Sequence, residues 1–133
     1  MAYLLDTSVA IQLRDGDPAV RSLLLTLEDM PSISAVTRVE LEGGVYAHAA
    51  LAEKRRKAID ALLREFAVLD FTSEIAAIYG TIVEQAGFSR RKITDRMIAA
   101  TALAHGLVLV TLNGRDFRDV PGLESAEWER PGE

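Results

Sequence analysis

Four acidic residues of this chain stand where an apolar run ends or begins, and their type suits metal-assisted chemistry on phosphates. They are Asp6, Glu40, Asp95 and Asp116. Carboxylates that gather at one edge of a sheet repel one another by several kcal/mol unless a divalent cation neutralises them. Such a site can clamp a phosphodiester and lower the pKa of the water that attacks phosphorus.

The remaining composition restricts which metal these acids can hold. The chain contains no cysteine, and its two histidines, His48 and His105, lie far apart in unlike contexts. A thiolate site and a multi-histidine site within one chain are therefore excluded. A metal held mainly by oxygen is expected to be Mg²⁺ or Mn²⁺.

Size, charge and hydropathy place the chain among ordinary globular proteins. It has 133 residues, 49% of them hydrophobic and 26% charged, with a net charge of −5. That charge argues against broad, passive binding to nucleic acid, although bound cations would offset clustered carboxylates. No apolar run reaches the roughly 18–20 residues that span a bilayer. The first residues lack the basic region of a signal peptide, so we expect a cytoplasmic protein without a membrane segment.

Short apolar runs alternate with helical patterns along the chain. Strands are expected at 2–5, 32–36, 67–71 and 107–112, with a further edge strand near 125–129. Helices are expected after Asp17-Pro18 and over 37–66, 73–87 and 94–105. This alternation predicts a single α/β domain over residues 1–133, with 123–133 as a C-terminal tail. Its mostly parallel central sheet of four to five strands would be flanked by helices.

In such a sheet, ligands bind outside the carboxyl ends of the strands. Asp6 follows the first strand, and Asn113 and Asp116 follow the run 107–112. The expected helices place Glu40 and Asp95 in first turns, from which they can converge on the same edge. Three hydroxyl residues stand beside these acids and can donate to them, position a water or cap a helix: Thr7, Ser8 and Thr111.

Each acid except Asp6 also has a purely structural interpretation. Asp95 can complement the dipole of the helix that it leads. Glu40 fits a capping box in which Thr37 is the N-cap, and Glu42 is a rival for its metal role. Asp116 can be a turn residue. Asp6 is harder to explain in this way, because a charge at the end of a buried strand needs a partner.

Taken in order, the segments around these acids resemble the motifs of PIN domains. The segments are Leu4-Leu5-Asp6-Thr7-Ser8, Val36-Thr37-Arg38-Val39-Glu40-Leu41-Glu42-Gly43-Gly44, Asp95-Arg96-Met97-Ile98-Ala99-Ala100-Thr101-Ala102 and Val110-Thr111-Leu112-Asn113-Gly114-Arg115-Asp116-Phe117. The likeness is closest to the VapC toxins of type II toxin–antitoxin pairs, and it runs from about residue 2 to residue 123.

The resemblance implies a Mg²⁺- or Mn²⁺-dependent endoribonuclease that acts as a toxin. The four acids would carry the metal and the catalysis, with Thr111 and Asn113 supporting the last motif. A homodimer silenced by a VapB-like antitoxin is expected. Arg90, Arg91, Lys92 and Arg115 are candidates for RNA contact. Arg96 is a fifth candidate, which either binds the scissile phosphate or pairs with an acid.

Two other functions are compatible with parts of the pattern. The first is a catalytically inactive PIN-like binding module, in which the acids are vestigial. The second is an aspartate-based phosphatase, which also begins with a strand that ends in aspartate. Phosphatases of that kind commonly carry a second acid two residues on, where this chain has Ser8.

Overall fold

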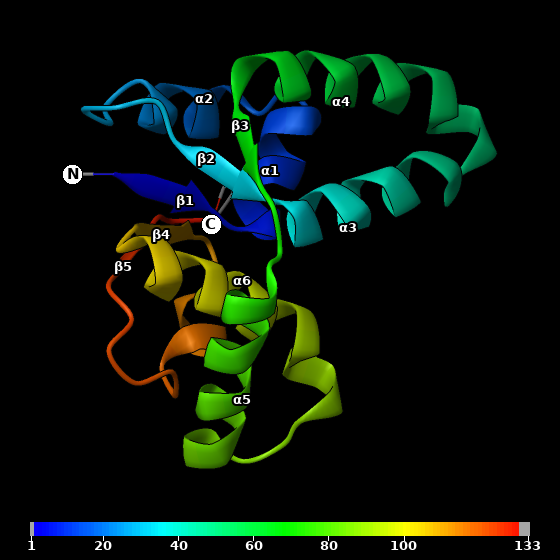
Figure 1. Ribbon diagram of the computed structural model, residues 1–133. Coiled ribbons are helices and arrows are strands. Elements are labelled where there is room, and N and C mark those ends of the chain that lie inside the picture. The colour runs from blue at the N-terminus through cyan, green and yellow to red at the C-terminus, as the bar shows by residue number, and fades with distance from the viewer. Residues whose placement is uncertain (1, 131–133) are drawn as a thin grey trace.

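Five parallel strands form the centre of the molecule, which is described here by a computed structural model covering residues 2–130 (Figure 1). The strands are β1 (Tyr3–Leu5), β2 (Ser32–Ser34), β3 (Ala67–Leu69), β4 (Val108–Thr111) and β5 (Ser125–Glu127). Their order in the sheet is β3-β2-β1-β4-β5, and every neighbouring pair is parallel. The predicted α/β class and the edge strand in the tail are confirmed. Residues 131–133 of that tail lie outside the described part of the chain.

Helices cover both faces of this sheet (Figure 1). They are α1 (Thr7–Arg14), α2 (Pro18–Leu24), α3 (Ala35–Tyr46), α4 (Ala52–Glu65), α5 (Ser73–Ala86) and α6 (Ile93–His105), with short 3₁₀ turns η1 (Ala49–Leu51), η2 (Arg90–Lys92) and η3 (Gly114–Phe117). Successive side chains of a strand point to opposite faces, so Leu5 joins the core under α1, α2 and α4, and Leu4 joins the core under α5 and α6. Within residues 2–130, no helix is both long enough and apolar enough to cross a membrane.

Local sequence signals fix several helix ends. The Asp17 side chain accepts a hydrogen bond from the Val20 amide at the start of α2, where Pro18 takes the first position. Thr72 caps α5 in the same way. Gly106 ends α6 with φ at +63°, a left-handed conformation that glycine adopts without a steric penalty.

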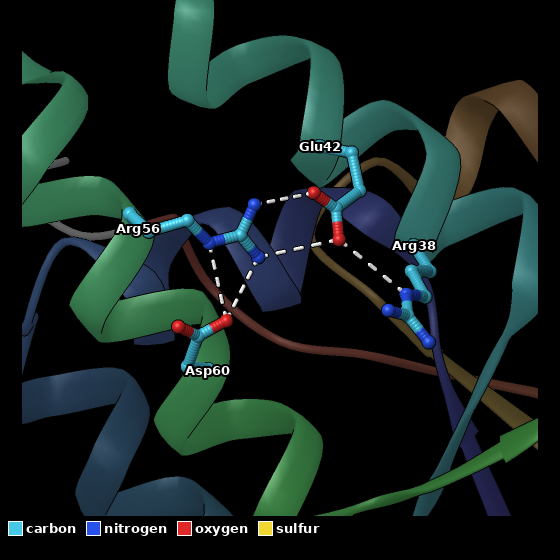
Figure 2. A network of polar contacts seen from close by, with 4 residues as sticks. All are labelled: Arg38, Glu42, Arg56 and Asp60. Carbon is cyan, nitrogen blue, oxygen red and sulfur yellow. Dashed lines mark hydrogen bonds and ion pairs between the residues drawn. The ribbon is translucent and has the colours of Figure 1, made fainter.

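The helical pattern expected over 37–66 is divided in the structure into two helices, α3 and α4, which are joined through η1. An ion-pair network holds them side by side (Figure 2). Arg56 on α4 contacts Glu42 on α3 at 2.5 Å and Asp60 at 2.9 Å, and Arg38 contacts Glu42 at 3.4 Å. The Arg56 guanidinium lowers the pKa of the Glu42 carboxyl. Glu42 therefore joins two helices.

Candidate active site

The order of the strands creates a natural binding position at the carboxyl end of the sheet. The chain builds outward from β1 to β2 and β3 on one side, and then returns to place β4 on the other side of β1. In open parallel sheets, ligands bind where the strand order reverses in this way. Asp6 directly follows β1, and Asn113 and Asp116 follow β4, so these residues stand at that position.

Asp6 is held rigidly at the end of β1. It is only 3% exposed and is the N-cap of α1. Its Oδ1 accepts hydrogen bonds from Ser8 Oγ at 2.5 Å and from the Val9 amide at 3.1 Å, and its Oδ2 accepts one from Thr111 Oγ1 at 2.5 Å. Burial raises the pKa of Asp6, and these hydrogen bonds act against the rise.

The hydroxyls that hold Asp6 are themselves fixed by the chain after β4. Ser8 Oγ accepts a hydrogen bond from the Leu112 amide at 3.1 Å, and Thr111 Oγ1 accepts one from the Asn113 amide at 2.9 Å. Both hydroxyls therefore accept from the backbone and donate to Asp6. This arrangement fixes the orientation of the carboxylate by tying the ends of β1 and β4 together.

Glu40 reaches the site from the second turn of α3. That helix begins at Ala35 because Ser34 caps it, with its hydroxyl accepting from the Val36 amide at 3.0 Å. The capping box with Thr37 as N-cap is therefore wrong, and Thr37 Oγ1 instead lies 3.0 Å from Thr7 Oγ1. Thr7 also donates to Glu40 Oε1 at 2.6 Å, which connects Glu40 to the turn that carries Asp6.

The pKa of Asp95 indicates that the other three acids lie near it. Asp95 lies in the first turn of α6, which follows η2 without a side-chain cap. Burial, followed by the negative charges of Asp116, Asp6 and Glu40, raises its pKa to about 6. These contributions mean that four segments distant in sequence place their carboxylates within electrostatic reach of one another.

All four acids line one cavity of about 350 Å³, together with Thr7, Ser8 and Asn113. Glu42 does not line it, so Glu40 is the acid that α3 contributes. Within residues 2–130, no three acidic or histidine side chains are drawn closely enough around one point to enclose an ion. Mg²⁺ suits such an open site, because it commonly keeps several waters and is held by one or two carboxylates. The metal-binding and catalytic roles of these residues stay predictions.

Arg96, a candidate for RNA contact, is buried instead. It is 2% exposed, and its guanidinium donates to the Gly87 carbonyl at 2.5 Å and to Asp119 at 2.9 Å. Asp119 also pairs with Lys92 at 2.9 Å. Of the two roles expected for Arg96, the structure shows the second, pairing with an acid, and its burial leaves the guanidinium away from the surface.

Arg91 and Arg115 line a second cavity, of about 870 Å³, that adjoins the first. The two cavities share the lining residues Asn113, Asp116 and Arg130. Arg118, just after η3, and residues of the tail complete the second cavity. Sequence patterns did not single out these tail residues: Glu127, Trp128, Glu129 and Arg130. The only signal for them was the expected edge strand near 125–129, which brings this segment beside the end of β4. Arg90 lines neither cavity.

Comparison with known proteins identifies the family of the chain and similar folds. The family model described as PIN domain matches residues 3–123. Ribonuclease VapC2 of Rickettsia felis is 29% identical, over 98% of this chain and 100% of its own length. The tRNA(fMet)-specific endonuclease VapC of Shigella flexneri is 30% identical, over 96% and 98%. A chain in the crystal structure of VapBC2 from Rickettsia felis bound to a promoter DNA fragment superimposes with a TM-score of 0.85, at 26% identity, over 97% of this chain and 100% of that one.

Proposed function

The chain belongs to the PIN domain family, and we propose that it is the endoribonuclease toxin of a VapBC-type toxin–antitoxin pair. The observation that carries the proposal is the convergence of Asp6, Glu40, Asp95 and Asp116 on one cavity at the carboxyl ends of β1 and β4. Relatives named ribonuclease or tRNA-specific endonuclease that align over nearly the whole chain support the same activity.

The donor set of this cavity fits a hard divalent cation such as Mg²⁺ or Mn²⁺. Carboxylate oxygens are the ligands these ions prefer. The pKa of Asp95 is raised first by burial and then by the negative charges of Asp116, Asp6 and Glu40, and a bound cation would offset those charges. A bound cation would supply Lewis-acid stabilisation of the phosphodiester and lower the pKa of the attacking water. Asp6 and Asp95 would be its main protein ligands. Glu40 and Asp116 would add negative charge that attracts the cation and could bind it as further ligands.

The surrounding residues prepare the carboxylates for this task. Ser8, Thr111 and the Val9 amide fix the rotamer of Asp6, so little reorganisation is needed when a ligand arrives. Thr7 orients Glu40 through its 2.6 Å hydrogen bond. Asn113 lies between the two cavities, where it can contact the phosphate that flanks the cleaved bond.

A VapB-type antitoxin is the expected partner, since the chain resembles chains of VapBC complexes over almost its full length. Assembly of the toxin as a homodimer and action in the cytoplasm, where RNA substrates are found, are further parts of the proposal. Sedimentation of the isolated toxin would test the dimer.

Cleavage of RNA by charge-removing variants tests the proposed activity. Asp6→Asn and Asp95→Asn should abolish cleavage in Mg²⁺ or Mn²⁺ while the circular dichroism spectrum stays that of the wild type. Asp70→Asn is the matched control, because Asp70 is an exposed aspartate just after β3 that lines neither cavity. Undiminished cleavage by both site variants would contradict the proposal.

A further inference from the structure

The larger cavity beside the carboxylates has the chemistry of a binding groove for single-stranded RNA. We infer that Arg91, Arg115 and Arg130 contact the phosphates of the strand next to the cleaved bond, and that Trp128 stacks on one of its unpaired bases. The inference rests on the proposed function and adds to it the residues that hold the substrate.

The first argument is the local charge. The chain as a whole carries a net charge of −5, yet four arginines line this one cavity: Arg91, Arg115, Arg118 and Arg130. Arg118 lies 3.9 Å from Glu127, so these two charges offset each other. No carboxylate within residues 2–130 forms an ion pair with Arg91, Arg115 or Arg130. Glu129 is the acid that remains on the groove wall besides Asp116.

The second argument is continuity with the carboxylates. Asn113, Asp116 and Arg130 line both cavities, and Arg130 donates a hydrogen bond to Asn113 Oδ1 at the boundary. A ligand that occupies the larger cavity therefore passes directly into the smaller one. A nucleic acid strand, with phosphates repeated along its length, is long enough to occupy both cavities at once, and a small anion is not.

The third argument is the anchoring of Trp128. Its amide donates to the Thr111 carbonyl at 2.8 Å, and its side chain is partly buried against the core that contains Leu112. Thr111 also holds Asp6, so the indole and the catalytic carboxylates share one rigid support. Aromatic side chains beside basic grooves stack on single-stranded bases with little sequence preference. A base in a duplex is not available for this contact.

The charge of the groove favours RNA over a segment of antitoxin. A basic inhibitory segment would be drawn to the four carboxylates and repelled by Arg91, Arg115 and Arg130, which have no ion-pair partner among residues 2–130. An anionic strand would be attracted by these arginines and excluded from the carboxylate cavity until cations offset its charge. Among the described residues, the arginines therefore supply affinity for phosphate where it does not depend on a bound cation.

Affinity for RNA as a function of salt tests this inference. Anisotropy of a short fluorescein-labelled single-stranded RNA of mixed sequence would be measured in EDTA, where divalent-dependent cleavage is silent. Each lost phosphate contact lowers the magnitude of the slope of log K against log salt by about 0.7, so Arg91→Ala/Arg115→Ala should lower it by about 1.4. Arg64→Ala is the matched control, since Arg64 is an exposed arginine on α4 that lines neither cavity.

Trp128 needs a separate readout, because it also packs against the core. Trp128→Leu should weaken binding about tenfold with the salt slope unchanged, since stacking is not an electrostatic contact. Trp128→Phe keeps an aromatic face and should retain most of the affinity, and its unfolding curve reports any loss of packing. Wild-type affinity in Trp128→Leu would overturn the stacking role.

The outcomes separate this inference from the proposed function. If the arginine variants bind RNA like the wild type while Asp6→Asn abolishes cleavage, the groove is refuted and the nuclease stands. If the same variants leave RNA affinity intact but weaken the complex with the antitoxin, the groove binds protein and the inference is also refuted. If the groove variants lose RNA binding but the wild type cleaves no RNA with either cation, the proposed nuclease activity is refuted while the RNA-binding groove is supported.

Discussion

Replacing Asp95 with asparagine should make the protein more stable in the absence of divalent cations, even though it removes a residue to which we assign a role in cleavage. Folding raises the pKa of this carboxyl from 3.8 to about 6, chiefly through burial and then through Asp116, Asp6 and Glu40. A folded-state pKa above the unfolded value means that the ionised form disfavours folding. The free energy of unfolding contributed by Asp95 therefore falls as pH rises from about 4 to about 6.

The magnitude follows from that shift. Two pKa units at about 1.4 kcal/mol each give an upper bound of about 3 kcal/mol at neutral pH. Asp95 is only partly buried, so solvent screening reduces this figure. Asparagine also gives up the favourable interaction of a charge with the first turn of α6, about 0.3–1 kcal/mol. The expected net gain in unfolding free energy is about 1–2 kcal/mol at neutral pH.

Urea unfolding in EDTA at several pH values measures this gain. The difference between Asp95→Asn and the wild type should be near zero at about pH 4 and reach its full value above about pH 6. Asp70→Asn should show no such difference. Addition of Mg²⁺ should stabilise the wild type through ligand binding, and stabilise the variant less. A variant less stable than the wild type at neutral pH, or a difference that does not change with pH, would refute this account of the site.

Three further substitutions test other parts of the structure. Thr111→Val keeps the side-chain shape but removes the donor to Asp6, so it should cost about 1–3 kcal/mol in urea unfolding and lower kcat; unchanged values for both would contradict the role assigned to Thr111. Glu40→Gln should lose RNA cleavage while Glu42→Gln retains it, since Glu40 lines the cavity and Glu42 pairs with Arg56 instead. Loss of cleavage in Glu42→Gln with normal cleavage in Glu40→Gln would show that Glu42 is the acid of the site. Arg96→Met removes the hydrogen bonds to the Gly87 carbonyl and Asp119, so it should lower the unfolding free energy by about 1–3 kcal/mol and leave RNA affinity unchanged. A variant as stable as the wild type that binds RNA weakly would show instead that Arg96 contacts the substrate.

The parallel sheet and the convergence of the acids were predictable because both depend on local patterns. Each strand is a short apolar run. Asp6 follows β1 directly, and Asp116 lies in the 3₁₀ turn η3 shortly after β4. Parallel strands end at one edge of the sheet, so residues that follow them meet without further information. The alternation of strands and helices was therefore enough to predict that these acids gather at one edge of the sheet.

The features that were missed depend on tertiary contacts. Hydrophobic periodicity continues from α3 into α4 without proline, so the sequence does not place the break between the two helices at residues 47–51. Their side-by-side packing through Arg56 and Glu42 shows where it lies (Figure 2). Arginine is rarely buried, so the burial of Arg96 required knowledge of Asp119 and the Gly87 carbonyl. Trp128 and its neighbours meet the end of β4 only because β5 pairs with that strand.

Manganese binding measured by isothermal titration tests most directly whether the four carboxylates form one metal site. The wild type should bind Mn²⁺ saturably, and Asp6→Asn and Asp95→Asn should each lose most of that binding while Asp70→Asn retains it. If the wild type shows no binding at millimolar Mn²⁺, or if both site variants bind it like the wild type, the cavity at the ends of β1 and β4 is not the metal site.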